Sequence, residues 1–372
     1  MEGAITGSRI ALNWIVFNTW STGAARRAYE LHRRMPEDLE FTAFVTRGFS
    51  REWRLECPGI RFVEVSGSRS FLGRLREGSA SYWSGLLKDQ ECGLWVTDTL
   101  PVPSGLSGTR TCITVHDLRF LASRNYLSLQ RYLLMKHSMG RSLERADAVV
   151  AVSQWTAQVL LDRYPVTAGK LSVVENSVDP EPFRISRPGG SPVSRPYIFS
   201  VGHLETRKNF ERLVEAFGIV SRMWDGNLVL VGGDQGSLRT ILENALRVGV
   251  SDRLMIRHDL DFETLVRFYR NAELVVCPSK YEGFGITLLE GMASGRAVAA
   301  SDIPPHREVA GEAALYFHPD DTPGMADAML NLARDRYLRE SLVQRGDIRL
   351  ERFSWERSAQ KLASLYRELL GR

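Results

Sequence analysis

Short apolar runs alternate with longer amphipathic segments along the whole chain, and this alternation predicts strands that are each followed by a helix. The runs are rich in Val, Ile and Ala and do not alternate strictly, which is typical of parallel strands covered on both faces. A first series predicts strands at 9–17, 39–46, 61–65, 93–96, 111–115, 148–152 and 171–175, with the longest helix at 127–145. A second series predicts strands at 197–201, 227–231, 253–257, 274–277 and 298–300, and a last amphipathic helix at 354–370.

A stretch dense in Pro, Gly and Ser separates the two series. It runs from Asp179 to Pro196 and is the best candidate linker in the chain. We therefore expect an α/β protein of two doubly wound domains that face each other across a cleft, with ligands at the carboxyl ends of the strands. The predicted domains are residues 1–186 and 187–352, and a C-terminal helix in 353–372 is expected to pack back towards the N-terminal domain.

The composition narrows the class of protein. The chain has 372 residues, of which 44% are hydrophobic and 25% charged, as in soluble globular proteins. It has no run of about 18 apolar residues and its start lacks the layout of a signal peptide, so we expect a cytoplasmic protein without a transmembrane helix. The four cysteines lack metal-site spacing, and we expect neither a disulfide framework nor a structural zinc.

The net charge of +4 lies entirely in the first half. Residues 1–186 carry 23 Lys and Arg against 19 Asp and Glu, whereas residues 187–372 carry 25 against 25. This small surplus, without a recognised motif, argues against nucleic-acid binding. A basic segment at 69–88, which includes Phe71, Tyr82 and Trp83, could dock peripherally on an anionic inner membrane surface. A solvated loop and helix flank explain the segment equally well.

The sequence at 279–295, Ser-Lys-Tyr-Glu-Gly-Phe-Gly-Ile-Thr-Leu-Leu-Glu-Gly-Met-Ala-Ser-Gly, follows a predicted buried strand. Gly283 and Gly285 predict a turn into a helix that begins near Ile286. This order places backbone N–H groups and the positive end of a helix dipole in a crevice where a phosphate binds. Glu282 precedes the turn and Glu290 lies about two helical turns later, so the two carboxylates could reach the sugar and the ribose of a nucleotide sugar.

A second candidate anion site begins the second domain. The predicted strand ends at Gly202, a loop presents Arg207 and Lys208, and a helix opens near Asn209. Lys208 is a point charge suited to a diphosphate, and Arg207 offers a planar fork of donors. Cations of this kind stabilise the negative charge that grows on a departing diphosphate. Since cations at a helix N-terminus oppose the dipole, their presence favours a binding site over simple hydration.

These motifs resemble those of the retaining GT-B glycosyltransferases of family 4. Glu282 and Glu290 stand in the setting Tyr-Glu-Gly-Phe-Gly, and Lys208 in Arg-Lys-Asn matches the position that contacts phosphate. The similarity is nearly continuous from 195 to about 355, and the segments 302–317 and 353–356 look most like O-antigen mannosyltransferases. The chain departs from the family in having His203 after Gly202, where the family has Arg or Thr.

The resemblance implies two Rossmann-like domains and transfer of a hexose, in the first place mannose from GDP-mannose, onto a lipid-linked or growing surface polysaccharide. It implies catalytic roles for His116, Arg207, Lys208 and Glu282. His116 would touch the sugar near its 6-hydroxyl, and Asp117 could hold its imidazole or cap the following segment. The residues implied in donor binding are Gly23, Gly202, Gly283, Phe284, Gly285, Ile286, Thr287, Leu288 and Glu290.

No cofactor and no metal ion is expected. Asp259 and Asp261 match an Asp-x-Asp metal signature, but they sit beside a predicted helix start, where an Asp is an ordinary N-cap. Other functions stay open: a donor carrying glucose, galactose, N-acetylglucosamine, rhamnose or fucose, or a GT-B epimerase or phosphorylase. A catalytically silent carbohydrate-binding partner is a further alternative, which the intact Lys208, Glu282 and Glu290 disfavour.

Overall fold

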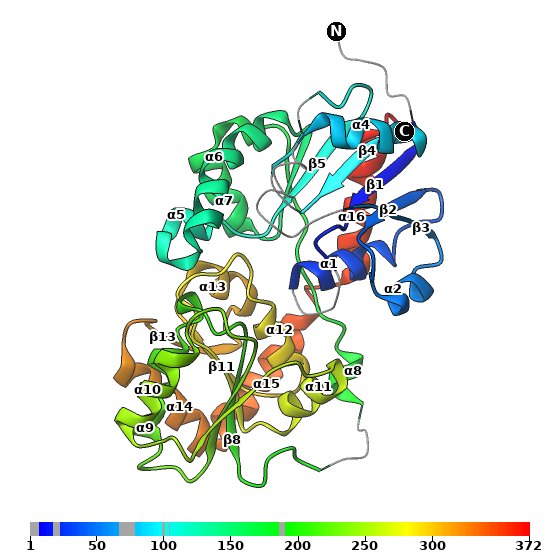
Figure 1. Ribbon diagram of the computed structural model, residues 1–372. Helices are drawn as coiled ribbons and strands as arrows, with labels where there is room; N and C mark the ends of the chain where they lie inside the picture. Colours follow the sequence, from blue (N-terminus) through cyan, green and yellow to red (C-terminus); the bar gives the residue numbers. More distant parts are fainter. Residues whose placement is uncertain (1–6, 18–22, 67–78, 99–100, 104, 186–189) are drawn as a thin grey trace. The chain divides into compact units, whose positions relative to one another are not determined.

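The computed structural model describes residues 7–17, 23–66, 79–98, 101–103, 105–185 and 190–372, and the chain forms two compact units (Figure 1). Unit 1 consists of Met1–Ser177 and Trp355–Arg372, and unit 2 consists of Val178–Ser354. The division therefore falls after Ser177, earlier than the predicted boundary after residue 186.

Unit 1 is built on a seven-stranded parallel sheet in the order β3-β2-β1-β4-β5-β6-β7. Strands β4 and β6 are buried along their whole length, as expected where helices cover both faces of a parallel sheet. The strands are β1 (Arg9–Asn13), β2 (Phe41–Val45), β3 (Ile60–Glu64), β4 (Cys92–Thr97), β5 (Arg110–Val115), β6 (Ala148–Ala151) and β7 (Leu171–Val173). The helices are α1 (Gly23–His32), α2 (Arg51–Glu56), α4 (Ala80–Asp89), α5 (Arg119–Ala122), η1 (Arg124–Tyr126), α6 (Leu129–Arg145), α7 (Gln154–Arg163), η2 (Pro165–Thr167) and α16 (Trp355–Leu369).

Unit 2 is built on a six-stranded parallel sheet in the order β10-β9-β8-β11-β12-β13. The strands are β8 (Tyr197–Val201), β9 (Asn227–Val231), β10 (Leu254–Arg257), β11 (Leu274–Cys277), β12 (Val298–Ser301) and β13 (Ala314–Phe317). The helices are α8 (Glu181–Arg184), η3 (Thr206–Lys208), α9 (Phe210–Val220), α10 (Leu238–Val248), α11 (Phe262–Asn271), α12 (Ile286–Ala293), α13 (Pro304–Ala310), α14 (Thr322–Arg334) and α15 (Arg336–Leu350).

The strand predictions are confirmed apart from two differences, and the predicted linker holds a short helix. The first strand is shorter than predicted, because β1 ends at Asn13 and the chain then turns, with the Phe17 amide donating to the Trp14 carbonyl at 3.0 Å. Strand β13 was not predicted; it has four residues, two of them only partly buried. The predicted linker contains helix α8, whose Phe183 is 1% exposed and packs edge-on against aromatic rings of α11.

The C-terminal helix α16 packs in unit 1 beside α1 (Figure 1). Arg34 forms a 2.7 Å ion pair with Glu356, and the Ser358 hydroxyl donates to the Glu175 carbonyl at 2.9 Å. Tyr366 is 1% exposed and covers the imidazole ring of His32. The apolar face of α16 thus completes the core of unit 1. No helix within the described ranges is long and apolar enough to span a bilayer.

Candidate active site

The candidate site of unit 2 lies where its sheet changes winding direction. Strands β8 and β11 are adjacent and parallel, with Ile198 beside Leu274 and Phe199 beside Val275. The strand that follows β8 in the chain, β9, lies on its other side. The loops after β8 and β11 therefore diverge to opposite faces of the sheet. A crevice at such a switch point is the usual ligand site of open α/β sheets.

These two loops are joined by a cluster of charged side chains. Arg207 and Lys208, in the 3-10 turn η3 after β8, both contact the Glu282 carboxylate in the loop after β11. The Arg207 Nη1–Glu282 Oε2 distance is 2.8 Å and the Lys208 Nζ–Glu282 Oε1 distance is 2.6 Å. The Ser279 hydroxyl donates to Glu282 Oε1 at 2.7 Å. The predicted phosphate-binding cations and the predicted sugar-binding carboxylate thus form one ion-paired cluster.

Carboxylates of the protein itself compensate the two cations near the N-terminus of α9. They precede α9 in a separate turn, and Glu205 also compensates Arg207, through a 2.6 Å contact between Arg207 Nη2 and Glu205 Oε1. The expected conflict with the dipole of α9 is therefore relieved by carboxylates of the protein itself. Arg207 also donates to the Tyr281 carbonyl at 2.7 Å and is 6% exposed, so it braces the loop after β11. Lys208 carries three donors, of which Glu282 takes one.

Burial alone would raise the pKa of the Glu282 carboxyl, whose side chain is 13% exposed. The charges of Arg207 and Lys208 and the hydrogen bond from Lys208 outweigh this penalty and hold its pKa well below the usual range of a glutamate. Glu282 is therefore ionised at any pH at which the protein would work. It can accept hydrogen bonds from sugar hydroxyls but cannot act as a general acid.

Asn209 fixes the geometry between the two loops. It adopts a left-handed conformation with φ of 60°, which Asn tolerates better than most residues, and forms the N-cap of α9. Its side-chain amide donates to the Pro278 carbonyl at 3.1 Å and to the Pro319 carbonyl at 2.8 Å. Asn209 therefore ties the turn that carries Lys208 to the loop that carries Glu282.

The predicted glycine turn and helix are present. Gly285 has a φ of 100°, a conformation that favours glycine, and is the N-cap of α12. The first turn of a helix leaves amides without intrahelical partners, so this N-terminus can receive an anion. After β8, a Cβ on Gly202 would lie 3.0 Å from the Cε atom of Lys208, so glycine leaves room there for the lysine stem.

The residues of this turn differ in what they can offer a ligand. The side chains of Phe284 and Leu288 are 3% and 0% exposed, and Phe284 packs edge-on against Phe353 at 5.8 Å. The Thr287 hydroxyl lies 3.4 Å from the Cys277 sulfur. Phe284 and Leu288 can therefore contact a nucleotide only through their backbone, whereas Ile286 and Thr287 are partly exposed and Gly283 is buried.

Glu290 is 6% exposed and lies on the second turn of α12. The Tyr269 hydroxyl of α11 donates to Glu290 Oε2 at 2.7 Å, which orients the carboxylate. Tyr269 was not predicted from the sequence. The hydrophobic pattern of α11 indicates that its aromatic residues are buried, but it does not show which of them donates a hydrogen bond to a distant carboxylate. The predicted ribose contact of Glu290 stays a prediction.

His306 of α13 lies against the same turn and was not predicted. It is 1% exposed, and its Nδ1 atom lies 3.0 Å from the Ser301 carbonyl oxygen. A Cβ added to Gly285 would come within 3.0 Å of the His306 ring, so the ring and the left-handed glycine are packed together. Burial lowers the pKa of His306 to about 4, with the charges of Lys208 and Arg207 acting in the same direction. His306 is therefore neutral at neutral pH.

In unit 1, the predicted His116 lies at the end of β5 and is paired with a residue that was not predicted. Its Nε2 atom lies 2.9 Å from Asp98 Oδ1, just after the end of the adjacent strand β4. Asp117 instead accepts a hydrogen bond from the Arg119 amide at 3.0 Å, so of its two suggested roles it has the capping one. Burial would raise the pKa of Asp98, but His116 and the charge of Arg27 lower it, which keeps the carboxyl ionised.

Gly23 is the first residue of α1 and is exposed, and residues 18–22 before it lie outside the described residues. Asp261 is the N-cap of α11 and accepts the Thr264 amide at 2.6 Å, so its assignment as a cap is confirmed. Among the described residues, no group of three or more His, Cys, Asp or Glu side chains is placed to hold a metal ion. The four cysteines are free and buried.

Two doubly wound units, the second with an anion-compatible turn at its switch point, define the GT-B class of folds. Residues 21–182 match the family described as Glycosyltransferase Family 4, and residues 183–349 match the family described as Glycosyl transferases group 1. The chain belongs to glycosyltransferase family 4, and it resembles the mannosyltransferases of that family.

Three similar proteins illustrate the relationship. The O-antigen chain mannosyltransferase RfbU of Salmonella typhimurium is 29% identical over 221 residues, which are 59% of this chain and 60% of that protein. The O-antigen chain mannosyltransferase B of Escherichia coli is 26% identical over 272 residues, 70% of this chain and 71% of that one. The Anabaena protein Alr3699/HepE in complex with UDP and glucose has a TM-score of 0.74 at 17% identity, covering 97% of this chain and 99% of that one.

Proposed function

We propose that the chain is a retaining glycosyltransferase that moves mannose from GDP-mannose onto a lipid-linked or growing surface polysaccharide. The observation that carries this proposal is the ion-paired cluster of Glu282, Lys208 and Arg207 beside the glycine turn of α12. The carboxylate proposed to bind the sugar and the ammonium proposed to bind the phosphate lie 2.6 Å apart, a spacing that would suit the junction of a diphosphate and a sugar. The named activity of the two O-antigen relatives supports mannose as the transferred sugar.

In this proposal the diphosphate binds between Lys208 and the N-terminus of α12. Two N–H donors of Lys208 are left for phosphate oxygens after the contact with Glu282. The backbone amides after Gly285 and the dipole of α12 supply the rest of the neutralisation. Arg207 acts indirectly, because the residue is 6% exposed and its guanidinium is held by two carboxylates and a carbonyl. No metal ion is needed to hold the diphosphate.

The remaining predicted residues recognise hydroxyl groups. Glu282, kept ionised by its two cations, accepts hydrogen bonds from the sugar. Glu290, oriented by Tyr269, accepts those of the ribose. His116 would contact the transferred sugar with the imidazole held by Asp98. Because the ionised carboxylate of Glu282 is an acceptor only, this proposed contact selects for polyols over apolar ligands.

Transfer with retention needs no protein nucleophile. The bond between the anomeric carbon and the diphosphate oxygen breaks, and the acceptor hydroxyl forms the new bond on the same face of the sugar. The proton of the hydroxyl passes to the departing diphosphate. Lys208 lowers the barrier by neutralising the charge that grows on that group, so Lys208→Ala should reduce turnover by about 10²-fold or more.

A panel of nucleotide sugars tests the donor. Release of the nucleoside diphosphate is measured for GDP-mannose, GDP-fucose, dTDP-rhamnose and the UDP derivatives of glucose, galactose and N-acetylglucosamine, with Lys208→Ala as the control. The proposal expects the highest rate with GDP-mannose and a large loss in the variant. Preference for another donor would contradict mannose transfer. Sugar binding without turnover of any donor would favour the silent carbohydrate-binding alternative.

A membrane contact is better supported at α5 and α6 than at the predicted segment 69–88. Residues 69–78 lie outside the described residues, and Trp83 is 0% exposed in the core of unit 1, where it packs edge-on against Phe44 and Trp95. By contrast, residues 118–145 carry six Lys and Arg against one Glu. Three exposed leucines lie among these cations, at 121, 129 and 133, with exposures of 38%, 54% and 42%. A basic surface with exposed leucines suits an anionic lipid surface.

Vesicle flotation tests this contact. Changing Leu129 and Leu133 to Ser should weaken binding to anionic vesicles and leave zwitterionic vesicles unbound. The matched control changes Leu242 and Leu246 of α10, which are 50% and 76% exposed, to Ser. Absence of binding at low salt, or equal losses in both pairs of variants, would contradict the lipid contact and favour a soluble acceptor.

A further inference from the structure

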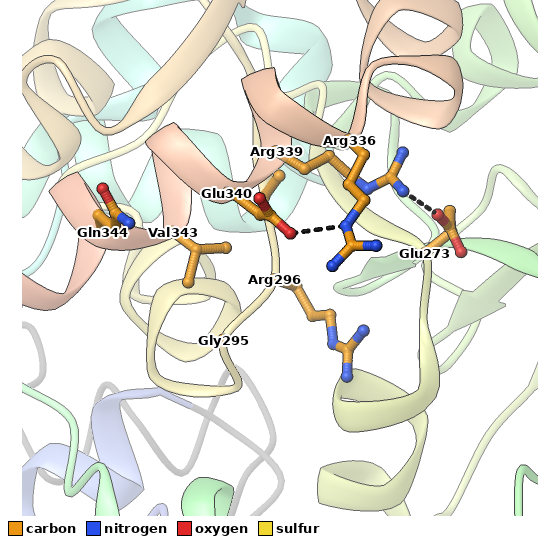
Figure 2. A pocket seen from close by; sticks show the side chains of 9 residues that line it. Glu273, Gly295, Arg296, Arg336, Arg339, Glu340, Val343 and Gln344 are labelled. Atoms are coloured by element: carbon orange, nitrogen blue, oxygen red, sulfur yellow. Dashed lines mark hydrogen bonds and ion pairs between the residues drawn. The ribbon is translucent and has the colours of Figure 1, made fainter.

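A cavity of about 580 Å³ lies at the opposite edge of the unit 2 sheet from the glycine turn. Glu273 and Ala297, which line it, immediately precede β11 and β12, so the cavity is at the amino ends of these strands. The other wall is one face of α15, formed by residues at 336, 339, 340, 343 and 344 (Figure 2). Because this spacing follows the helical repeat, the face is continuous. We call this cavity the basic crevice.

Three arginines and two glutamates surround the basic crevice, and the pairing among them is incomplete. Arg339 pairs with Glu273 at 2.9 Å, and Arg336 pairs with Glu340 at 2.7 Å (Figure 2). These pairs use both carboxylates that line the cavity. The remaining cation is Arg296, so the lining carries one uncompensated positive charge.

Arg296 lies just beyond the C-terminal end of α12 and has no polar partner for its guanidinium among the described residues. Its Nε atom is buried without an acceptor, and no carboxylate of the described chain lies within ion-pair distance. Desolvation lowers the pKa of Arg296, with Glu273 and Tyr197 opposing that effect from a longer range. A desolvated cation without a partner is unfavourable in the free protein, and an anion that binds it removes that penalty.

We propose that the basic crevice binds a phosphate group of a small molecule, which Arg296 contacts with its planar fork of donors and Arg336 supports from α15. Arginine is suited to bidentate contacts with phosphate oxygens. The volume is within the range of small-molecule sites, roughly 300–1,000 Å³, so a phosphate ester fits as well as the free ion. The site is distinct from the proposed donor site, since it lies at the other edge of the same sheet.

The crevice has a direct structural link to the donor turn. Arg296 follows α12 at one end, and Gly285 begins the same eight-residue helix at the other. The Arg296 amide donates to the Gly291 carbonyl at 3.1 Å, which ties the arginine to the last turn of α12. A ligand held by Arg296 therefore reduces opening of the last turn of α12. Hydrogen exchange of α12 and α15 can report binding without any measurement of transfer.

The experiment is a titration of the full chain with inorganic phosphate and with a hexose phosphate at constant ionic strength. Heat of binding and hydrogen exchange are measured for the wild type, Arg296→Gln, Arg239→Gln and Lys208→Ala. Arg239 is the matched control, since it is an exposed arginine paired with Glu243 on α10 and its replacement removes the same charge. We expect Arg296→Gln to weaken phosphate binding at least about tenfold, and the other two variants to retain it.

The other possible results either overturn the proposed phosphate site or identify its ligand. Unchanged binding in Arg296→Gln, or loss of all binding in Lys208→Ala, would overturn the proposal, the latter because the ion would then sit at the donor turn. Tighter binding of the hexose phosphate identifies an ester as the ligand, and equal binding identifies the free ion. Without phosphate, hydrogen exchange of α12 in Arg296→Gln should be as slow as in the wild type or slower, because the change removes an uncompensated charge. Clearly faster exchange would contradict the absence of a partner for Arg296.

Discussion

Replacing Glu282 with Ala should destabilise the loops after β8 and β11, and the size of the effect follows from the contacts. The change removes the 2.6 Å contact to Lys208 and the 2.8 Å contact to Arg207. Glu205 still compensates Arg207, so the stranded charge is Lys208, whose side chain is 13% exposed. Removing one partner of a buried ion pair costs about 3–5 kcal/mol. The flexible stem of Lys208 can carry its ammonium towards water, which sets the expected loss at about 3 kcal/mol.

A double-mutant cycle isolates the pair. Lys208→Ala leaves Glu282 with Arg207 and Ser279, so it should cost only about 1–2 kcal/mol. The double variant no longer strands a charge, and we expect it to be about 2 kcal/mol more stable than the sum of the single changes implies. Glu282→Gln is the conservative control, because an amide keeps the shape of the side chain and part of its hydrogen bonding.

Hydrogen exchange of the peptides spanning 274–293 and 202–213 is the suitable assay. A single unfolding curve is not well defined for two units, whereas local exchange reports the opening free energy of these loops directly. Additivity of the two changes within about 0.5 kcal/mol would refute the coupling between Glu282 and Lys208, since sites that do not interact behave in this way. The predicted coupling would also fail if Lys208→Ala were the more destabilising of the two single changes.

Three further predictions concern ligands and pH. Glu290→Gln should mainly weaken GDP binding, whereas Glu282→Gln should depress transfer while GDP still binds; calorimetry showing equal losses of GDP affinity would refute this division. Activity should survive EDTA, because the proposed neutralisation of the diphosphate uses Lys208 and a helix N-terminus, and abolition reversed by Mn²⁺ or Mg²⁺ would contradict it. The pKa values of the buried His32 and His306 are lowered to about 4, so the unfolded chain binds more protons between roughly pH 6.5 and 4. Stability should therefore fall on acidification through that window, by up to about 1.4 kcal/mol per pH unit for each group, and His306→Gln should flatten the pH dependence measured in unit 2 peptides.

The sequence was sufficient for the parallel sheets and for the glycine turn into α12, because each rests on local patterns. The runs at β8, β9 and β11 have the predicted bounds, and Gly285 begins α12 as the glycine turn required. The sequence did not predict which side chains pair with each other. Glu282 meets Lys208 across 74 positions, and Asp98 meets His116 between two strand ends. Such pairs depend on which strands become neighbours in the sheet, and hydrophobic periodicity does not report strand order.

His306 and Arg296 were missed for a different reason. A histidine in a short helix and an arginine after a helix carry no local signal. His306 is informative through its burial, and Arg296 through its lack of a polar partner among the described residues. Both became informative only when the packing around Gly285 and the pairing of Glu273 and Glu340 were known. Whether a charged side chain has an oppositely charged partner depends on the folded structure, so composition and residue spacing do not predict it.

The return of α16 to unit 1 has a consequence for the order in which the protein matures during synthesis. Unit 2 occupies Val178–Ser354, so all of it leaves the ribosome before the helix that completes unit 1. At roughly 5–20 residues per second, the interval is on the order of ten seconds or more, long compared with the folding of most single domains. During that time the surface around His32, which Tyr366 covers in the finished protein, faces solvent or a chaperone. The unit that begins first is therefore the last to finish, and nascent chains that stall after Ser354 should present a folded unit 2 beside an unfinished unit 1.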